Sequence, residues 1–225
     1  MVLKNMKAMG IKIIKYLRFF GLFVKLNYLK AMEYRVNFWA ALLAPFLYSV
    51  GYIIYLNVLL SKTPTINGWG FDQMVMLFAC GQLFYYSAWV LYRAALEIFA
   101  YSVRDGSFDF AFKTPINPRF NISFREQRLN IIIPFIFSIG LFIYGARNID
   151  ISVISVLLFL ILFIFGLIIY YNFIFTLISV TFWVIDSDEL LWFGDDSIRF
   201  GSYPMSIYPK FFALLLISVL PILLV

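Results

Sequence analysis

Side chains that could carry out acid–base, metal or redox chemistry are scarce in this sequence. Its 225 residues include no histidine and one cysteine, Cys80, which lies inside an apolar run. Disulfide frameworks, Cys/His metal sites and histidine acid–base chemistry are therefore excluded. No GxxxxGK(S/T) phosphate-binding loop occurs, so we expect the chain to bind no cofactor and to be no ATPase by itself.

Three charged side chains, Asp195, Asp196 and Arg199, lie close together in the part of the chain where hydrophobicity fades, residues 186–202. If this part of the chain crosses a membrane, these side chains are expected to face protein or a water-filled cavity, because charges are rare at membrane depth. One interpretation is therefore a polar lining of a transport pathway, and the other is a segment that lies at the membrane surface and spans nothing. An enzyme site is disfavoured because no histidine or cysteine pair accompanies these carboxylates.

Aromatic and amide side chains in two expected spans form a second candidate lining of a pathway. The residues concerned are Tyr48, Tyr52, Gln82 and Tyr85. An aromatic face can bind a lipophilic or cationic cargo by stacking and by cation–π contact. Packing between helices, or contact with lipid, is the favoured alternative because aromatic residues make up 21% of the whole chain.

Three further residues are expected to have structural roles. Cys80 is interpreted as a small buried apolar side chain. Glu97 and Glu126 could carry protons, but ordinary salt bridges with nearby basic residues are favoured.

The composition indicates a protein whose main solvent is lipid. Hydrophobic residues make up 63% of the chain and charged residues 13%, against roughly 45–50% and about 25% in soluble domains. The net charge of +6 on so apolar a chain points to anionic lipid headgroups rather than to nucleic acid. We therefore expect an all-α, polytopic helical membrane protein.

The first 37 residues predict a basic amphipathic helix. At 100° per residue, one apolar stripe collects Met6, Met9, Ile13, Leu17, Phe20 and Val24, and most lysines and arginines of this segment lie opposite. Such a helix is expected to lie in the cytoplasmic membrane interface, with its basic side against anionic headgroups. Packing on another protein surface is the alternative.

Apolar runs long enough to cross a bilayer follow at residues 38–60, 74–92, 129–146 and 151–185, since a span needs roughly 20 residues. The last run would be roughly 50 Å long as one helix, at about 1.5 Å per residue. It must tilt, protrude or break. Two short spans that turn at residues 170–172 are the alternative, although no Gly or Pro lies there.

The distribution of lysine and arginine predicts the orientation. Eight precede the first span and six lie in the 93–128 loop, whereas residues 61–73 contain only Lys62 and residues 147–150 only Arg147. Because positive charge favours the cytoplasmic side, we expect a multi-pass protein of the cell membrane with its N-terminus and the 93–128 loop in the cytoplasm.

The 93–128 loop contains the most informative segment. Its phenylalanines alternate with small or polar residues, a pattern that by itself favours a strand. We prefer to interpret this segment as a short helix. Gly106 would end the preceding segment, Ser107 would cap the N-terminus of the helix, and Pro115 would end it. Asp109 would then lie in the first turn, where the helix dipole favours an anion. The residues singled out are Arg104, Gly106, Phe108, Asp109, Phe110, Phe112 and Pro115.

Residues 106–115 resemble a loop of the permease subunits of type-2 ATP-binding-cassette exporters. In that family the loop has Gly, then Thr or Ser, an apolar residue, Glu or Asp, three mostly apolar residues, a variable position, and Thr-Pro. Ala111 is smaller than the usual leucine. Residues 32–38 (Met-Glu-Tyr-Arg-x-Asn-Phe) and 203–209 (Tyr-Pro-x-x-Ile-Tyr-Pro) resemble a less studied branch of these permeases.

The resemblance implies a permease subunit that provides a translocation pathway. The loop would be a coupling helix that docks into a separate P-loop ATPase subunit, which binds the ATP, and two permeases would pair as a homo- or heterodimer. The resemblance also implies three further segments. These are a fifth span at 189–203, an external re-entrant element at 204–219 and a sixth span largely beyond Val225. The fallback topology has two spans in 151–185 and an external loop at 186–208.

Two classes of function remain open at this point. The first is the exporter permease, and the second is a channel or accessory scaffold that works without an ATPase. No inverted repeat is evident in the pattern of spans, which disfavours a secondary transporter. A pathway lined by apolar side chains would admit lipids, drugs and peptides alike, so the sequence leaves the cargo undefined.

Overall fold

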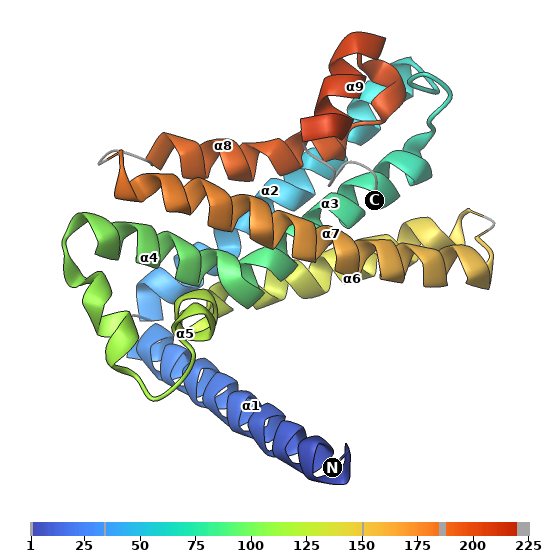
Figure 1. Ribbon diagram of the computed structural model, residues 1–225. Coiled ribbons are helices and arrows are strands. Elements are labelled where there is room, and N and C mark those ends of the chain that lie inside the picture. The colour runs from blue at the N-terminus through green and yellow to red at the C-terminus, as the bar shows by residue number, and fades with distance from the viewer. Residues whose placement is uncertain (1, 34, 150, 185–187, 220–225) are drawn as a thin grey trace.

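The computed structural model describes residues 2–33, 35–149, 151–184 and 188–219, which form an assembly of helices without strands (Figure 1). This confirms the all-α fold. The α-helices are α1 (Val2–Glu33), α2 (Arg35–Lys62), α3 (Phe71–Ala88), α4 (Ala94–Arg104), α5 (Pro118–Phe124), α6 (Ile132–Arg147), α7 (Val153–Ser179), α8 (Asp188–Arg199) and α9 (Lys210–Val219). A π-helical turn, η1 (Trp89–Arg93), joins α3 to α4. Short 3₁₀ helices are Ser107–Lys113 (η2), Leu129–Ile131, Val180–Phe182, Phe200–Ser202 and Met205–Ile207.

Four helical stretches of the described residues are long and apolar enough to cross a membrane: Phe38–Lys62, Phe71–Arg104, Leu129–Arg147 and Val153–Phe182. Large apolar side chains lie exposed along their outer faces, for example Leu157, Ile161 and Phe165 on α7. Contiguous apolar surface of this kind is unfavourable in water and suits hydrocarbon.

The second of these stretches is longer than the sequence suggested. It continues as one helix from Phe71 through η1 to Arg104, so the first part of the expected 93–128 loop is helical. The reason is packing, because Leu96 and Ala100 are buried in the same core cluster as Tyr170 and Ile174 of α7. At 1.5 Å per residue this helix is about 50 Å long.

Helix α7 is likewise continuous across residues 170–172, where the alternative topology would place a turn. Tyr170 is fully buried in the core, and Ile174 and Ile178 continue the same buried face. The helix tightens into the 3₁₀ turn Val180–Phe182 before the described chain is interrupted at residue 185.

Helix α8 lies beside α7 and runs antiparallel to it (Figure 1). A Cβ atom on Gly194 would overlap Cδ1 of Ile174, so glycine permits this close approach. With 12 residues α8 is about 18 Å long, short of the roughly 30 Å of a bilayer core. The region of the expected fifth span, 189–203, thus holds a short helix and a 3₁₀ turn.

The expected external element, 204–219, consists of the 3₁₀ turn Met205–Ile207 and α9. It lies near the connection between α2 and α3, where the side-chain amide of Asn67 donates a hydrogen bond to the carbonyl of Ser206 at 3.1 Å. Residues 220–225, where a sixth span was expected to begin, are outside the described part of the chain.

A buried ion pair joins the long helix to α8. Nε and Nη2 of Arg93 donate to the two carboxylate oxygens of Asp195 at 2.8 and 2.7 Å, and the hydroxyl of Tyr170 donates to Oδ1 at 2.9 Å. The side chain of Arg93 is only 2% exposed, and its guanidinium lies 4.8 Å from the centre of the Trp89 ring. The pair therefore fixes α8 against α3, α4 and α7.

This pairing divides the charge group Asp195, Asp196 and Arg199. Asp195 points to the core, whereas Asp196 and Arg199 are exposed and pair with each other at 3.4 Å. The three charges therefore do not form one polar surface. Arg93, which the sequence placed among the loop cations, instead neutralises Asp195 because the helix continues past it.

Replacing Arg93 with methionine should destabilise the protein strongly, because it leaves the Asp195 carboxylate half-buried without a cation. Breaking a buried pair from one side costs about 3–5 kcal/mol, whereas removing both charges is often close to neutral. We therefore expect a lower midpoint of thermal unfolding in detergent for Arg93→Met, and partial recovery in Arg93→Met/Asp195→Leu. If the double variant were less stable than either single variant, the charges of Arg93 and Asp195 would not be compensating each other.

Candidate functional site

The segment singled out by its alternating phenylalanines lies at the end of the bundle where α4 stops, at the left of Figure 1. Gly106 adopts a left-handed conformation, with φ of 75°, that reverses the chain after α4. Glycine is favoured there because a Cβ would strain this conformation. Residues 107–113 then form the 3₁₀ helix η2 rather than a strand or an α-helix.

The cap of this turn differs from the expected Ser107. The carboxylate of Asp105 accepts the backbone N–H of Ser107 at 2.9 Å, so Asp105 stabilises the turn. Hydrogen bonds from the Ser107 hydroxyl and backbone lower the pKa of the Asp105 carboxyl. A lowered pKa means that this stabilisation is present above the ordinary pKa of about 4 and is lost as the pH falls through the folded-state value.

The outer side of η2 presents an apolar surface flanked by charges, which we call the tip surface: Asp109, Phe110, Phe112 and Lys113. Phe110 is 60% exposed and Phe112 is 55% exposed. The ammonium of Lys113 lies 4.4 Å from the centre of the Phe110 ring. Phe108, by contrast, packs inward on Phe182, with ring centres 5.8 Å apart.

Hydrogen bonds brace the tip against α5 and α1. The side-chain amide of Asn121 donates to the carbonyl of Ala111 at 3.1 Å, and the ammonium of Lys15 donates to the carbonyl of Pro115 at 3.0 Å. Behind the tip, Asn27 donates to the side-chain oxygen of Gln127 at 2.8 Å. The position of the tip surface relative to α5 and α1 is therefore fixed by hydrogen bonds.

Other predicted residues near the tip occupy defined places. Arg104 lies over the ring of Tyr101, with its guanidinium carbon 5.4 Å from the ring centre. Glu97 pairs with Arg128 at 2.9 Å and Glu126 with Lys30 at 3.4 Å, which confirms the expected salt bridges.

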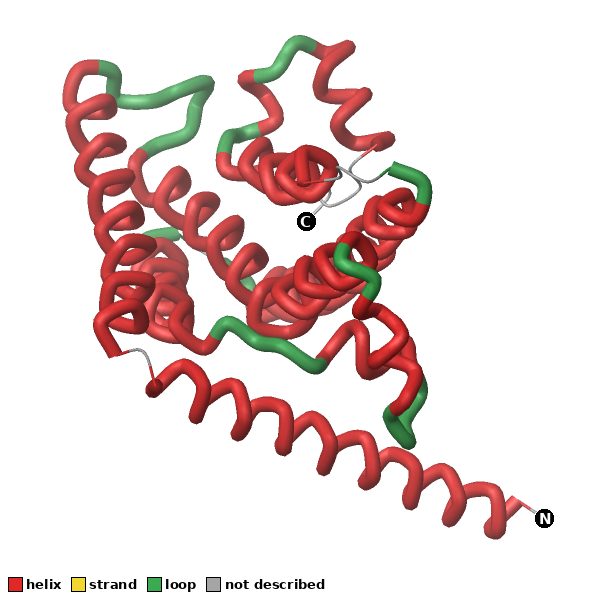
Figure 2. The backbone as a smooth tube through the Cα atoms, turned by 90° about the vertical axis from the view of Figure 1, so that its left-hand side faces the viewer, coloured by secondary structure: helices red, strands yellow, loops and turns green. Residues whose placement is uncertain are grey.

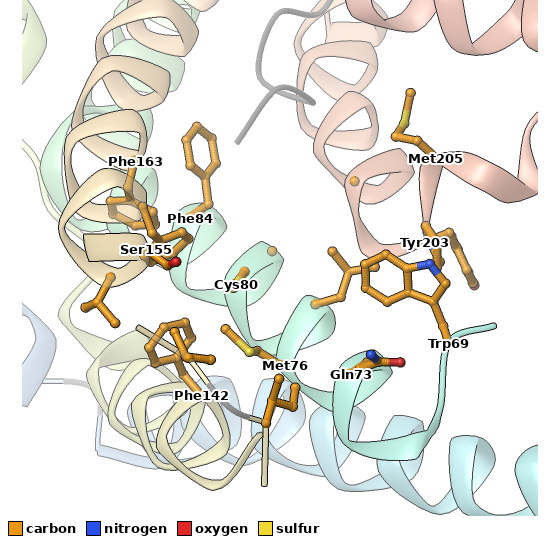
Figure 3. Close-up of a pocket in the computed structure, with 18 of the residues that line it drawn as sticks. Trp69, Gln73, Met76, Cys80, Phe84, Phe142, Ser155, Phe163, Tyr203 and Met205 are labelled. Carbon is orange, nitrogen blue, oxygen red and sulfur yellow. The ribbon is translucent and has the colours of Figure 1, made fainter. Parts of the chain in front are cut away.

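A cavity of about 640 Å³ lies at the other end of the long helix, between α3, α6, α7 and residues 198–205 (Figure 3). Most of its wall is apolar, with polar groups from Gln73, Ser155 and Tyr203. From α3 it is lined by Met76, Cys80 and Phe84, which follow each other at steps of four residues along one helix face. This volume falls within the range of about 300–1,000 Å³ typical of small-molecule sites.

The residues predicted to line a pathway lie outside this cavity. Tyr48 is exposed, and Tyr52 stacks on Phe78 with ring centres 4.0 Å apart. Gln82 and Tyr85 are half-buried on α3, where Tyr85 packs against Trp89. Cys80, taken as a packed core residue, instead contributes to the cavity wall. The four-residue spacing of Met76, Cys80 and Phe84 in the sequence indicates that they share one face of a helix. The sequence around them does not show whether that face lines a cavity or packs against another helix.

The single cysteine makes the cavity testable in the natural protein. We expect N-ethylmaleimide, which is small and uncharged, to reach Cys80 because the side chain lines a space that can admit it, and to react slowly because the apolar surroundings disfavour the reactive thiolate. Val156→Trp should slow this reaction about tenfold by filling the cavity from α7. Val153→Trp is the matched control, since Val153 is one turn earlier and 76% exposed. Equal labelling rates in both variants, measured by mass spectrometry, would show that the cavity is not the route to Cys80.

A comparison with protein families gives a match over most of the chain. Residues 46–225 match the family model of the ABC-2 family transporter proteins, which is well over half of the chain. No curated protein and no solved structure matches the sequence. Proteins of this family are transport permeases, and the described helices include four that are able to span a membrane. The chain is a multi-pass membrane protein and a permease component of an ABC transporter, and it belongs to the ABC-2 family of transporter proteins.

Proposed function

We propose that the chain is the permease subunit of an ATP-driven exporter and that its tip surface docks onto a separate P-loop ATPase subunit, which binds the ATP. The observation that carries this proposal is the exposure of Phe110 and Phe112 on η2. Two exposed phenylalanines between Asp109 and Lys113 are typical of a protein interface, with an apolar centre and a charged rim. The type-2 exporter class and its less studied branch rest on the resemblance of residues 32–38, 106–115 and 203–209.

The long helix provides a mechanical connection for coupling. Its end at Arg104 leads directly into the turn that supports η2, and its opposite half contributes Met76, Cys80 and Phe84 to the cavity. Helices transmit displacement along their axis because their backbone hydrogen bonds are continuous. A movement of the docked tip would therefore displace one wall of the cavity.

Orientation and assembly are part of the same proposal. The concentration of lysine and arginine in residues 1–37 and 104–128 supports a cytoplasmic N-terminus and tip in the cell membrane, on the side where ATP is present. A second permease subunit, identical or related, would complete the pathway, because the four helices of the described chain that are able to span a membrane are too few to enclose a wide route. The other partners would be the surrounding lipids, and we expect the chain not to bind nucleic acid.

The second class of function, a channel or scaffold independent of ATPase, differs in one observable respect. A channel would conduct its cargo without ATP, whereas the proposed exporter would require ATP and a bound ATPase subunit. The family match favours the exporter, since the matched family consists of transporter permeases.

Phe110→Asp should abolish docking, because an interface that buries a phenylalanine would then have to desolvate a carboxylate. We expect co-purification of the cognate ATPase subunit to fall at least tenfold and ATP-dependent transport to be lost. Phe110→Leu is the matched control and should retain both, because leucine remains apolar. Co-purification and transport that survive Phe110→Asp, with normal membrane insertion, would refute the docking assignment.

A further inference from the structure

A second cavity, of about 750 Å³, is lined by residues of α1, α5 and α7. Figure 2 shows the long N-terminal helix, α1, running along one side of the bundle. The wall of the cavity is almost entirely apolar, with side chains from all three helices and from η1. Aromatic contacts connect the helices around it, since Tyr16 of α1 packs on Phe120 of α5 with ring centres 4.8 Å apart. The apolar residues that line it include Leu91, Phe120, Phe124, Ile164, Leu167 and Ile168.

One exposed cation, Arg119, lies at the edge of this apolar cavity. Its Nε donates to the hydroxyl of Tyr171 at 3.2 Å and its Nη2 to the side-chain oxygen of Asn172 at 3.4 Å. Its guanidinium carbon lies 5.1 Å from the centre of the Phe175 ring. These partners are neutral, and no carboxylate among the described residues pairs with Arg119. The guanidinium is thus held in place with its positive charge uncompensated.

The segments around the cavity are strongly basic. Helix α1 carries seven lysines and arginines before its first acidic residue, Glu33, and residues 113–125 contain three basic residues and no acidic one. Helix α7 has no charged residue. Lys15 of α1 uses one of its three N–H donors on the carbonyl of Pro115, which leaves two for another acceptor. A ligand at this edge must therefore supply the negative charge.

We propose that this cavity binds an anionic phospholipid, with an acyl chain along the apolar wall and the headgroup phosphate at Arg119. Arginine suits this role because its planar donors match phosphate oxygens and its charge persists at all physiological pH values. A soluble phosphate could contact Arg119 but could not cover the apolar wall, on which Ile164 and Ile168 are more than half exposed. The uncompensated charge excludes a zwitterionic lipid as the preferred one.

The bound lipid would have a structural consequence. It would join α1 to α5 and α7 through one molecule, in addition to the direct contacts of Tyr16 with Phe120 and of Asn27 with Gln127. This inference requires the chain to be a membrane protein and does not depend on the docking of an ATPase at the tip.

The test uses the complete chain reconstituted in nanodiscs that contain phosphatidylcholine and phosphatidylglycerol, followed by native mass spectrometry of the lipids that the protein retains. We expect the natural protein to retain about one phosphatidylglycerol molecule per chain in preference to phosphatidylcholine. Arg119→Gln should reduce this retention about tenfold, since a charge-assisted contact to phosphate is lost. Arg125→Gln, which changes an exposed arginine of the same region that does not line the cavity, should not change it.

A second variant separates lipid binding from folding. Ile164→Trp fills the apolar wall, leaves Arg119 intact and should also lower retention, while elution volume and maleimide labelling of Cys80 report a preserved fold. Equal retention of both lipids by the natural protein would overturn the proposal, as would equal loss in Arg119→Gln and Arg125→Gln. Competition by glycerol phosphate, which has no acyl chain, would overturn the role of the apolar wall. Co-purification of the ATPase should be unchanged in Arg119→Gln, so this result is independent of the proposed coupling.

Discussion

An arginine buried among apolar helices persists only where another group neutralises its charge, and here the carboxylate of Asp195 does so for Arg93. The need to neutralise Arg93 also determines how neighbouring helices are placed. It holds α8 against α7 at the depth of η1, and Tyr170 is drawn into the same hydrogen-bonded group. Trp89 covers the guanidinium on one side. The polar centre of the bundle is thus closed to lipid, and the surrounding helices can expose purely apolar faces.

The π-helical turn at Trp89–Arg93 lies where this polar centre meets the long helix. On one side of it, α3 contributes to the wall of the cavity that contains Cys80, and on the other, α4 leads to the tip. A π-turn widens the helix locally and frequently occurs at functional positions. The arrangement connects a surface suited to a partner protein with a space suited to a small molecule, through one continuous helix whose middle is fixed by an ion pair.

Surface chemistry varies along the molecule in a way that matches a bilayer. The spanning helices expose leucine, isoleucine and phenylalanine, whereas α1 and the segment from Lys113 to Arg125 expose basic residues. Helix α1 is amphipathic in sequence, but its contacts divide the expected apolar stripe. Phe20 packs on Phe124, and Leu17 is exposed to the surroundings. Both surfaces of this helix are therefore used, one against protein and one available to lipid.

Composition and local pattern determined the broad character of this protein. Apolar runs of spanning length can form only helices in lipid, so the all-helical fold followed from the sequence. The reversal at Gly106 was also local, because it depends on one residue's backbone freedom. The Arg93–Asp195 pair was not predictable in this way, since its partners are 102 positions apart and their approach depends on Gly194 and the continuation of α3 into α4. The two cavities, and the separation of Asp195 from Asp196 and Arg199, were decided by the tertiary structure alone, because helical periodicity identifies a buried face without identifying what lies opposite it.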